Sequence, residues 1–85
     1  MRDDYTSGKI SITAAAQEIN PSFDIGEVSF SGDEEFLFRI KNKNGWGTWI
    51  SVPSTVAFHD LMRGSRVQVK ALSGTVTLYY FIRGV

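Results

Sequence analysis

Hydrophobic and polar residues alternate in short runs along the chain, and each run ends at a cluster of Gly, Asn, Ser or Asp. This period of two with frequent turn residues is typical of short antiparallel strands. The clearest inward-facing positions are Val28, Phe30, Phe36, Phe38 and Ile40. Segment 14–20 stays undecided, because its three alanines favour a helical turn that Pro21 would end. We predict an all-β protein, a small antiparallel β-sandwich or jelly-roll-like barrel of about seven or eight short strands.

The C-terminal part of the chain predicts a β-hairpin. Two alternating apolar runs, 67–72 and 75–82, flank Ser73 and Gly74, a pair typical of the centre of a tight turn. One face of such a hairpin is apolar throughout, with Ala71 opposite Val76, Val69 opposite Leu78 and Val67 opposite Tyr80. We expect this face to form part of the core.

The opposite face of this hairpin carries two large aromatic residues among polar neighbours. The same register places Tyr79 opposite Gln68 and Phe81 opposite Arg66. Aromatic side chains on the outer face of a small sheet are typical of a domain that binds something, itself included, rather than one that transforms a substrate. We therefore predict that Tyr79 and Phe81 are protein-interface residues.

Asn44 and Gly45 give the strongest hairpin signal in the chain, because a type I′ turn needs positive φ at both central residues. With these two at the centre, Ile40 pairs with Trp49 and Phe38 with Ser51 on one face, and Arg39 pairs with Ile50 and Leu37 with Val52 on the other. Trp49 then enters the core. Gly47 leaves a second register open, in which a longer, bulged loop moves the partners by one residue and exchanges the faces of Trp49 and Ile50.

Two groups of residues are candidates for ligand binding. Trp46 and Trp49 follow the turn, and flat indoles stack on sugar rings or fill partner pockets. The alternative places the indoles in the core or as a lid over the end of the sheet. A short basic stripe leads to Trp46 on one strand face by period two, formed by Arg39, Lys41 and Lys43. The stripe suits an acidic surface, although Glu35 in the same row favours an ordinary solvated face.

The composition sets further limits on partners. The chain has 85 residues, no cysteine, nine Lys plus Arg and nine Asp plus Glu. We expect residues 9–85 to form one β domain and residues 1–8 to form an N-terminal arm that can be flexible. Oligomerisation commonly reinforces so small a domain, and zero net charge permits close packing of copies. The same balance argues against nucleic acid as a partner. The first residues form no apolar run, so we expect neither a signal peptide nor a membrane anchor.

Candidate catalytic chemistry is sparse. His59 is the single histidine, and its neighbour Asp60 points the other way if the chain is extended there, so the two do not form an orienting pair. The acidic clusters 3–4 and 33–35 lack the spaced ligands of a calcium-binding loop. We therefore expect no enzyme, no metal site and no cofactor.

Several motifs resemble small virion proteins of tailed bacteriophages. They are Asn44-Gly45-Trp46-Gly47-Thr48-Trp49, Val52-Pro53, Arg63-Gly64 and the segment 67–78, and together they cover about the last half of the chain. Members of this group are short, cysteine-free β domains that decorate or cement a capsid, or sit on the tail.

The resemblance implies a non-enzymatic structural subunit, made in the host cytoplasm and located in the virion. It implies a trimer or another small symmetric oligomer that binds the major capsid protein or another virion protein and stabilises the shell. The subunit or capsid contacts that it implies are Tyr79, Phe81, Leu37, Ile50 and Val52. The alternative function, based on the tryptophans, is a carbohydrate- or receptor-binding β module, including a tail-associated one.

Overall fold

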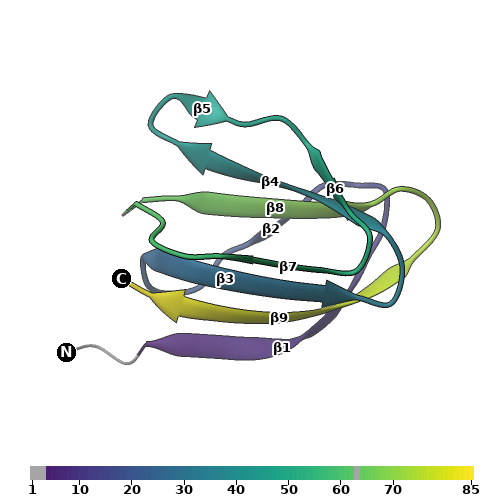
Figure 1. The fold of residues 1–85 in the computed structure, drawn as a ribbon, viewed down its shortest axis with the longest axis horizontal. Helices are drawn as coiled ribbons and strands as arrows, with labels where there is room; N and C mark the ends of the chain where they lie inside the picture. Colours follow the sequence, from purple (N-terminus) through teal and green to yellow (C-terminus); the bar gives the residue numbers. More distant parts are fainter. Residues whose placement is uncertain (1–3, 63) are drawn as a thin grey trace.

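Nine strands and no helix make up the described part of the chain. The computed structural model describes residues 4–62 and 64–85. The strands are β1 (Tyr5–Ile12), β2 (Gln17–Ile19), β3 (Ile25–Gly32), β4 (Phe36–Asn42), β5 (Gly45–Trp46), β6 (Ile50–Val52), β7 (Thr55–Phe58), β8 (Arg66–Ala71) and β9 (Val76–Gly84). They form two sheets, and β1 begins at the same end of the molecule at which β9 ends (Figure 1).

The strand order is that of a jelly roll. The first sheet runs β1-β9-β3-β7, and the second runs β2-β8-β4-β5, with β6 also paired to β4. All of these pairs are antiparallel. If β5 and β6 are counted as two halves of one interrupted edge strand, each sheet has four strands, and the chain changes sheet after every strand except between β4 and β5, as in a jelly roll. The predicted all-β sandwich is confirmed.

The core lies between the two sheets and is made of inward-facing residues from both. Thirteen hydrophobic residues form it, each no more than 4% exposed: Ile12, Ile25, Val28, Phe30, Phe36, Phe38, Val52, Val67, Val69, Ala71, Val76, Leu78 and Ile82. Two aromatic pairs join the sheets, Phe30 with Phe36 at 6.4 Å and Phe38 with Phe58 at 5.2 Å between ring centroids. Such pairs add about 0.5–1.5 kcal/mol beyond the area they bury.

The predicted hairpin of β8 and β9 is wrong in its pairing. β8 lies between β2 and β4 in the second sheet, whereas β9 lies between β1 and β3 in the first. Five of the six predicted inward residues are nevertheless in the core and the sixth, Tyr80, is partly buried against it, because two consecutive strands can face one core from opposite sheets. Gly74, with φ of 63°, lies in the turn through which the chain passes between them. Tyr79 is therefore not a neighbour of Gln68, nor Phe81 of Arg66.

The turn near Asn44 is centred one residue earlier than predicted. Lys41 pairs with Trp46 and Asn42 with Gly45, so Lys43 and Asn44 are the central residues. The positive φ of Gly45, 109°, falls just after them. The predicted type I′ turn at Asn44-Gly45 is wrong because the chain uses the flexible glycine to enter β5 rather than to form the turn itself.

Beyond this turn the second predicted register, with the bulge, is the one that forms. The Gly47 N–H donates to the Ile40 carbonyl at 2.9 Å, and β6 then pairs Phe38 with Ile50 and Phe36 with Val52. The shift of one residue exchanges the two faces of the strand. Trp49 therefore lies outside the core, contrary to the first register, and Val52 lies inside it at 4% exposure. Val52 is wrong as an interface residue because its side chain is buried.

β1 begins within the predicted arm 1–8. Its first residue, Tyr5, pairs with Arg83 of β9, and the Tyr5 ring stacks on Phe81 with 5.8 Å between centroids and 28° between planes. The ladder with β9 and this stacking order the arm from Tyr5 onward as part of the first sheet. Residues 1–3 lie outside the described residues.

The undecided segment 14–20 forms a bend followed by β2. The Ala15 N–H donates to Thr13 Oγ1 at 3.3 Å within the bend. Gln17–Ile19 then pairs with β8. The backbone groups that a helical turn would have bonded internally are used by the ladder with β8 instead.

Candidate binding faces

The first candidate site is the outer face of the first sheet, here called the aromatic face and defined by Tyr5, Tyr79 and Phe81. The three side chains come from the neighbouring strands β1 and β9, and on β9 they alternate with inward-facing residues. Tyr5 is 63% exposed and Tyr79 is 52% exposed, while Phe81 is half-buried under the Tyr5 ring. Exposed aromatic surface of this kind is available to a partner.

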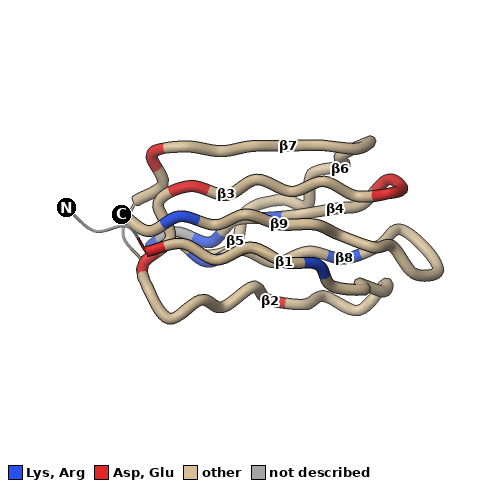
Figure 2. The backbone as a smooth tube through the Cα atoms, turned by 90° about the horizontal axis from the view of Figure 1, so that it is seen from below, with Lys and Arg blue, Asp and Glu red and all other residues tan. Residues whose placement is uncertain are grey.

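Short hydroxyl side chains lie along much of the aromatic face, which Lys9 borders opposite Tyr79 and Arg83 opposite Tyr5. Phe81 lies between Ser7 of β1 and Ser29 of β3, and Tyr79 has Ser31 of β3 on one side. Serine is too short to cover a neighbouring ring, so the aromatic side chains stand above the sheet. Figure 2 shows that the charged positions of β3 and β9 lie toward their ends and that the middle of both strands is free of charge.

The second candidate site is the outer face of the second sheet. Two indoles and four cations meet there, and we call it the cation–indole face: Trp46, Trp49, Arg39, Lys41, Arg66 and Lys70. The Arg39 guanidinium carbon lies 4.8 Å from the centroid of the Trp46 ring and 4.4 Å from that of Trp49. The Lys70 ammonium lies 4.3 Å from Trp49. Cations at these distances are attracted by the ring faces.

Trp46 has two further cations around it. The Lys41 ammonium lies 5.9 Å from its ring centroid, and the Arg66 guanidinium carbon lies 5.6 Å from it. Register explains the meeting, because β4 pairs Lys41 with Arg66 on one side and with Trp46 on the other. Arg39 occupies the same outward row of β4, two residues earlier.

Hydrogen bonds fix two of the cations in place. Arg39 Nε donates to Gln68 Oε1 at 2.8 Å. Arg66 donates from Nε and Nη2 to the two carboxylate oxygens of Glu18, at 2.7 and 2.6 Å. This bidentate pair lowers the pKa of Glu18, with smaller contributions from the charges of Arg66 and Lys41, and it raises the pKa of Arg66. Such a pair fixes geometry as well as charge.

The remaining cations of this face form no ion pair within the described part of the chain, although Glu18 lies close enough to Lys41 for the two charges to interact. Within residues 4–62 and 64–85, no ion pair joins Arg39, Lys41 or Lys70 to a carboxylate. Glu35, which shares the outward row of β4, accepts a hydrogen bond from Ser51 instead. A chain with zero net charge thus carries a local excess of positive charge over the two indoles.

The structure brings together four of the five residues predicted to bind a ligand: Trp46, Trp49, Arg39 and Lys41. Lys43 is exposed in the β4–β5 turn, away from this row. Sequence reasoning missed Arg66 and Lys70, because it assigned β8 to a hairpin with β9. The sequence did contain a signal for them. Arg66, Gln68 and Lys70 are polar residues at every second position, and this pattern marks the outward face of a strand.

The two other predicted contact residues lie on the second sheet. Leu37 is half-buried on the outer side of β4, where it pairs with Lys70 of β8 and Ser51 of β6. Ile50 is 50% exposed on β6, an edge strand. Neither lies on the aromatic face, so the five predicted contacts do not form one surface.

His59 contacts the carboxylate of Glu27. Its Nδ1 lies 2.6 Å from Glu27 Oε2, and the imidazole is 64% exposed. Both side chains border an open pocket of about 500 Å³ whose lining contains no hydroxyl or thiol side chain that could act as a nucleophile. No group of three His, Cys, Asp or Glu side chains suited to a metal ion occurs in the described residues.

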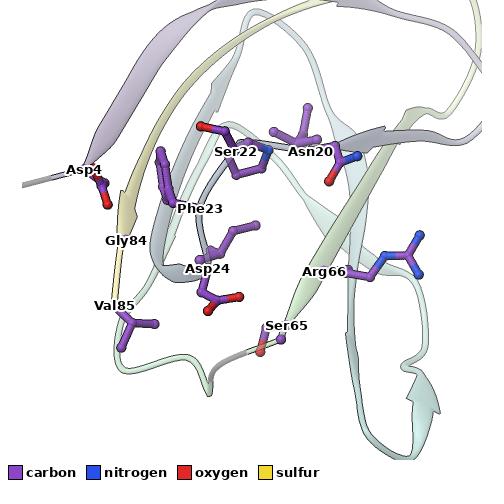
Figure 3. Close-up of a pocket in the computed structure, with 13 residues that line it drawn as sticks. Asp4, Asn20, Ser22, Phe23, Asp24, Ser65, Arg66, Gly84 and Val85 are labelled. Carbon is purple, nitrogen blue, oxygen red and sulfur yellow. The ribbon is translucent and has the colours of Figure 1, made fainter. Parts of the chain in front are cut away.

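A larger pocket of about 680 Å³ opens at one end of the sandwich. Figure 3 shows Asp24 in its middle, with Asp4 and Phe23 on one side and Ser65 and Arg66 on the other. Both aspartates already interact with other groups of the protein. The Ser65 hydroxyl donates to the Met62 carbonyl at 2.7 Å, so its hydrogen is also in use.

Comparisons with known proteins add no family. No family model and no curated protein matches the chain. One solved structure is similar in fold, a de novo designed double-stranded β-helix determined by NMR in solution. It is 13% identical, with a TM-score of 0.49 over 92% of this chain and 97% of that one. No helix in the described residues is long and apolar enough to span a membrane.

Proposed function

We propose that the chain is a non-enzymatic bacteriophage virion structural protein that binds the outer shell of a capsid and stabilises it. The observation that carries this proposal is the aromatic face. Tyr5 and Tyr79 expose more than half of their surface on a sheet where their outward neighbours are the serines of β1 and β3 together with Lys9 and Arg83. A face of this composition is suited to a protein partner, because tyrosines contribute much of the binding energy at interfaces.

The electrostatics of the aromatic face agree with attachment to a large assembly. The middle of β3 and β9 carries no charge, Lys9 of β1 stands beside Tyr79, and the chain as a whole has zero net charge. Copies can therefore occupy neighbouring positions on a shell without long-range repulsion. The same face is available for contacts within a trimer or another small symmetric oligomer.

The partner is inferred from the resemblance to small virion proteins and not from the fold alone. Jelly rolls occur in viral capsids, in lectins and in many enzymes, so the architecture permits the proposal without selecting it. The resemblance supplies the virion, and the aromatic face supplies the means of attachment.

Co-sedimentation with capsids purified from the phage that encodes the chain tests the proposal. We expect the wild-type chain to sediment with the shells, and Tyr79→Thr to weaken the interaction about tenfold or more. Lys41→Gln, on the opposite face, is the matched control and should bind as the wild type does. Failure of the wild-type chain to sediment with the shells would overturn the proposal, as would equal binding of Tyr79→Thr.

Carbohydrate binding is a second candidate function, favoured by the cation–indole face. Both tryptophans of the chain lie there, among polar side chains from three strands. Indoles with adjacent hydrogen-bonding groups suit sugar rings. Because the two outer faces of a sandwich point in opposite directions, this function is compatible with attachment through the aromatic face.

A further inference from the structure

We infer that the cation–indole face binds an acidic glycan, a polysaccharide that carries carboxylate or sulfate groups. The inference deepens the carbohydrate-binding candidate by naming its ligand class, and it rests on charge complementarity. Arg39, Lys41 and Lys70 stand on this face without an ion-pair partner among the carboxylates of the described chain. An anionic ligand would supply the missing counter-charge.

The indoles hold these cations in position for such a ligand. Arg39 lies within 4.8 Å of both ring centroids and is further fixed by its hydrogen bond to Gln68. Lys70 is held over Trp49 at 4.3 Å. Side chains that are already ordered lose less conformational entropy when they bind a ligand. The three cations therefore form a prearranged row across β4 and β8.

The polar groups of this face favour a glycan over a nucleic acid. Gln68, Glu18 and Glu35 share the outer face with the cations. A carboxylate can only accept hydrogen bonds, so it matches the hydroxyl donors that a glycan carries between its charged groups and that the sugar–phosphate backbone of DNA lacks. A nucleic-acid-binding domain also usually carries a clear basic excess, and this chain has none.

The arrangement has a consequence for an attached subunit. With the aromatic face against a shell, the cation–indole face on the other sheet would point away from it. The site would then be presented to glycans on the surroundings of the particle, such as an acidic polysaccharide coat. Substitutions on the aromatic face should therefore change capsid binding alone, and substitutions on the cation–indole face should change glycan binding alone.

Tryptophan fluorescence, excited selectively over that of tyrosine, reports on this face, because the only two tryptophans of the chain lie there. The experiment is a titration of the purified full chain with heparin, a sulfated glycan, and with polygalacturonate, a carboxylated one. Neutral dextran and oligothymidylate are the comparison ligands. We expect a saturable fluorescence change with one or both acidic glycans and none with dextran.

Two double variants with the same change in charge locate the binding. Lys41→Gln with Lys70→Gln removes two cations from the cation–indole face, and Lys9→Gln with Arg83→Gln removes two from the first sheet. We expect the first pair to lower the affinity about tenfold and the second to leave it within about twofold. Equal losses in both would show attraction to net charge and would overturn the assigned face.

Three other outcomes would overturn the inference. They are equal binding of dextran, tighter binding of oligothymidylate than of either glycan, and no binding of any of the four ligands. Failure here is distinguishable from failure of the capsid proposal, because capsid binding is measured by sedimentation and depends on Tyr79. If the inference holds, Tyr79→Thr should bind the acidic glycan as the wild type does.

Discussion

The two outer faces of the sandwich differ in how far their side chains are used within the molecule. On the aromatic face one ring contact, between Tyr5 and Phe81, joins the exposed aromatic residues. On the cation–indole face five cation–ring contacts and three side-chain hydrogen bonds connect the strands. Most of the exposed aromatic surface of the first face is therefore available to a partner. The side chains of the second face also stabilise their own sheet.

Strand pairing produces this difference. Phe81 of β9 lies between serines of β1 and β3, and Tyr79 lies between Ser31 of β3 and Lys9 of β1, so one long side chain borders the β9 rings. The outward residues of β8 lie beside the long side chains of β4, and the edge segments that carry Trp46 and Trp49 bring the indoles to these side chains. The length of the neighbouring side chains thus decides how far the aromatic rings of each face are covered within the molecule.

The largest effect is expected from the core that the two faces share. Phe38→Ala removes a side chain that is 1% exposed and contacts Phe58 of the opposite sheet. We expect a loss of about 3–5 kcal/mol in the free energy of unfolding, from lost burial and the cavity that remains. Urea denaturation followed by circular dichroism measures it. In a domain of 85 residues such a loss removes much of the total stability.

Both faces should fail together in this variant, because the core holds both sheets. Phe38→Leu serves as the comparison, since it keeps most of the apolar volume and should cost clearly less. If Phe38→Ala lost one binding activity and kept the other at full strength, the two sheets would not depend on a common core.

A smaller loss is expected from Trp49→Ala on the cation–indole face. The variant removes the ring that holds Arg39 and Lys70, and we expect it to cost about 1–2 kcal/mol from two cation–ring contacts and partly buried indole surface. Thermal unfolding should show a melting temperature lower by about 4–15 °C. Trp49→Phe keeps an aromatic face and should recover part of the loss. An unchanged melting temperature in Trp49→Ala would mean that this face does not stabilise its sheet.

The alternation of apolar and polar residues predicted which side chains are buried much better than it predicted which strands are neighbours. The inward direction predicted for residues of β8 and β9 was correct, with Tyr80 only partly buried, because direction depends only on the position of each residue in its own strand. Pairing depends on the whole topology, and a short turn such as Ser73-Gly74 can join strands within one sheet or across two. The local pattern is the same in both cases.

In the candidate sites, too, residues of one hairpin were grouped correctly, whereas residues from distant strands were not. Arg39, Lys41 and Trp46 were grouped correctly because they belong to one hairpin. Arg66 and Lys70 join them from a strand far along the chain, which only the strand order brings alongside β4. Val52 was misplaced by a shift of one residue, which is enough to move a side chain from the surface to the core.

Tyr79→Thr should have almost no effect on stability, in contrast to Trp49→Ala. Tyr79 is 52% exposed, and threonine is also favoured in strands, so we expect the free energy of unfolding to change by no more than about 0.5 kcal/mol. The same urea series measures this. The variant therefore separates binding from folding on the aromatic face. A loss as large as that of Trp49→Ala would mean that Tyr79 is needed for the sheet itself.

The smallest effect is expected at the edge of the cation–indole face, where Glu18 meets Arg66. The bidentate bond to Arg66 lowers the pKa of Glu18 in the folded chain below its ordinary value of 4.5. Its contribution to stability is therefore present above that value and is lost as the pH falls through the lowered pKa. Because Arg66 is half-exposed, the contribution is small. Denaturation of Glu18→Gln across this pH range should show a weaker loss toward acid than the wild type. Arg66→Gln should weaken the loss likewise, whereas wild-type acid sensitivity in both variants would show that the pair is not coupled to folding.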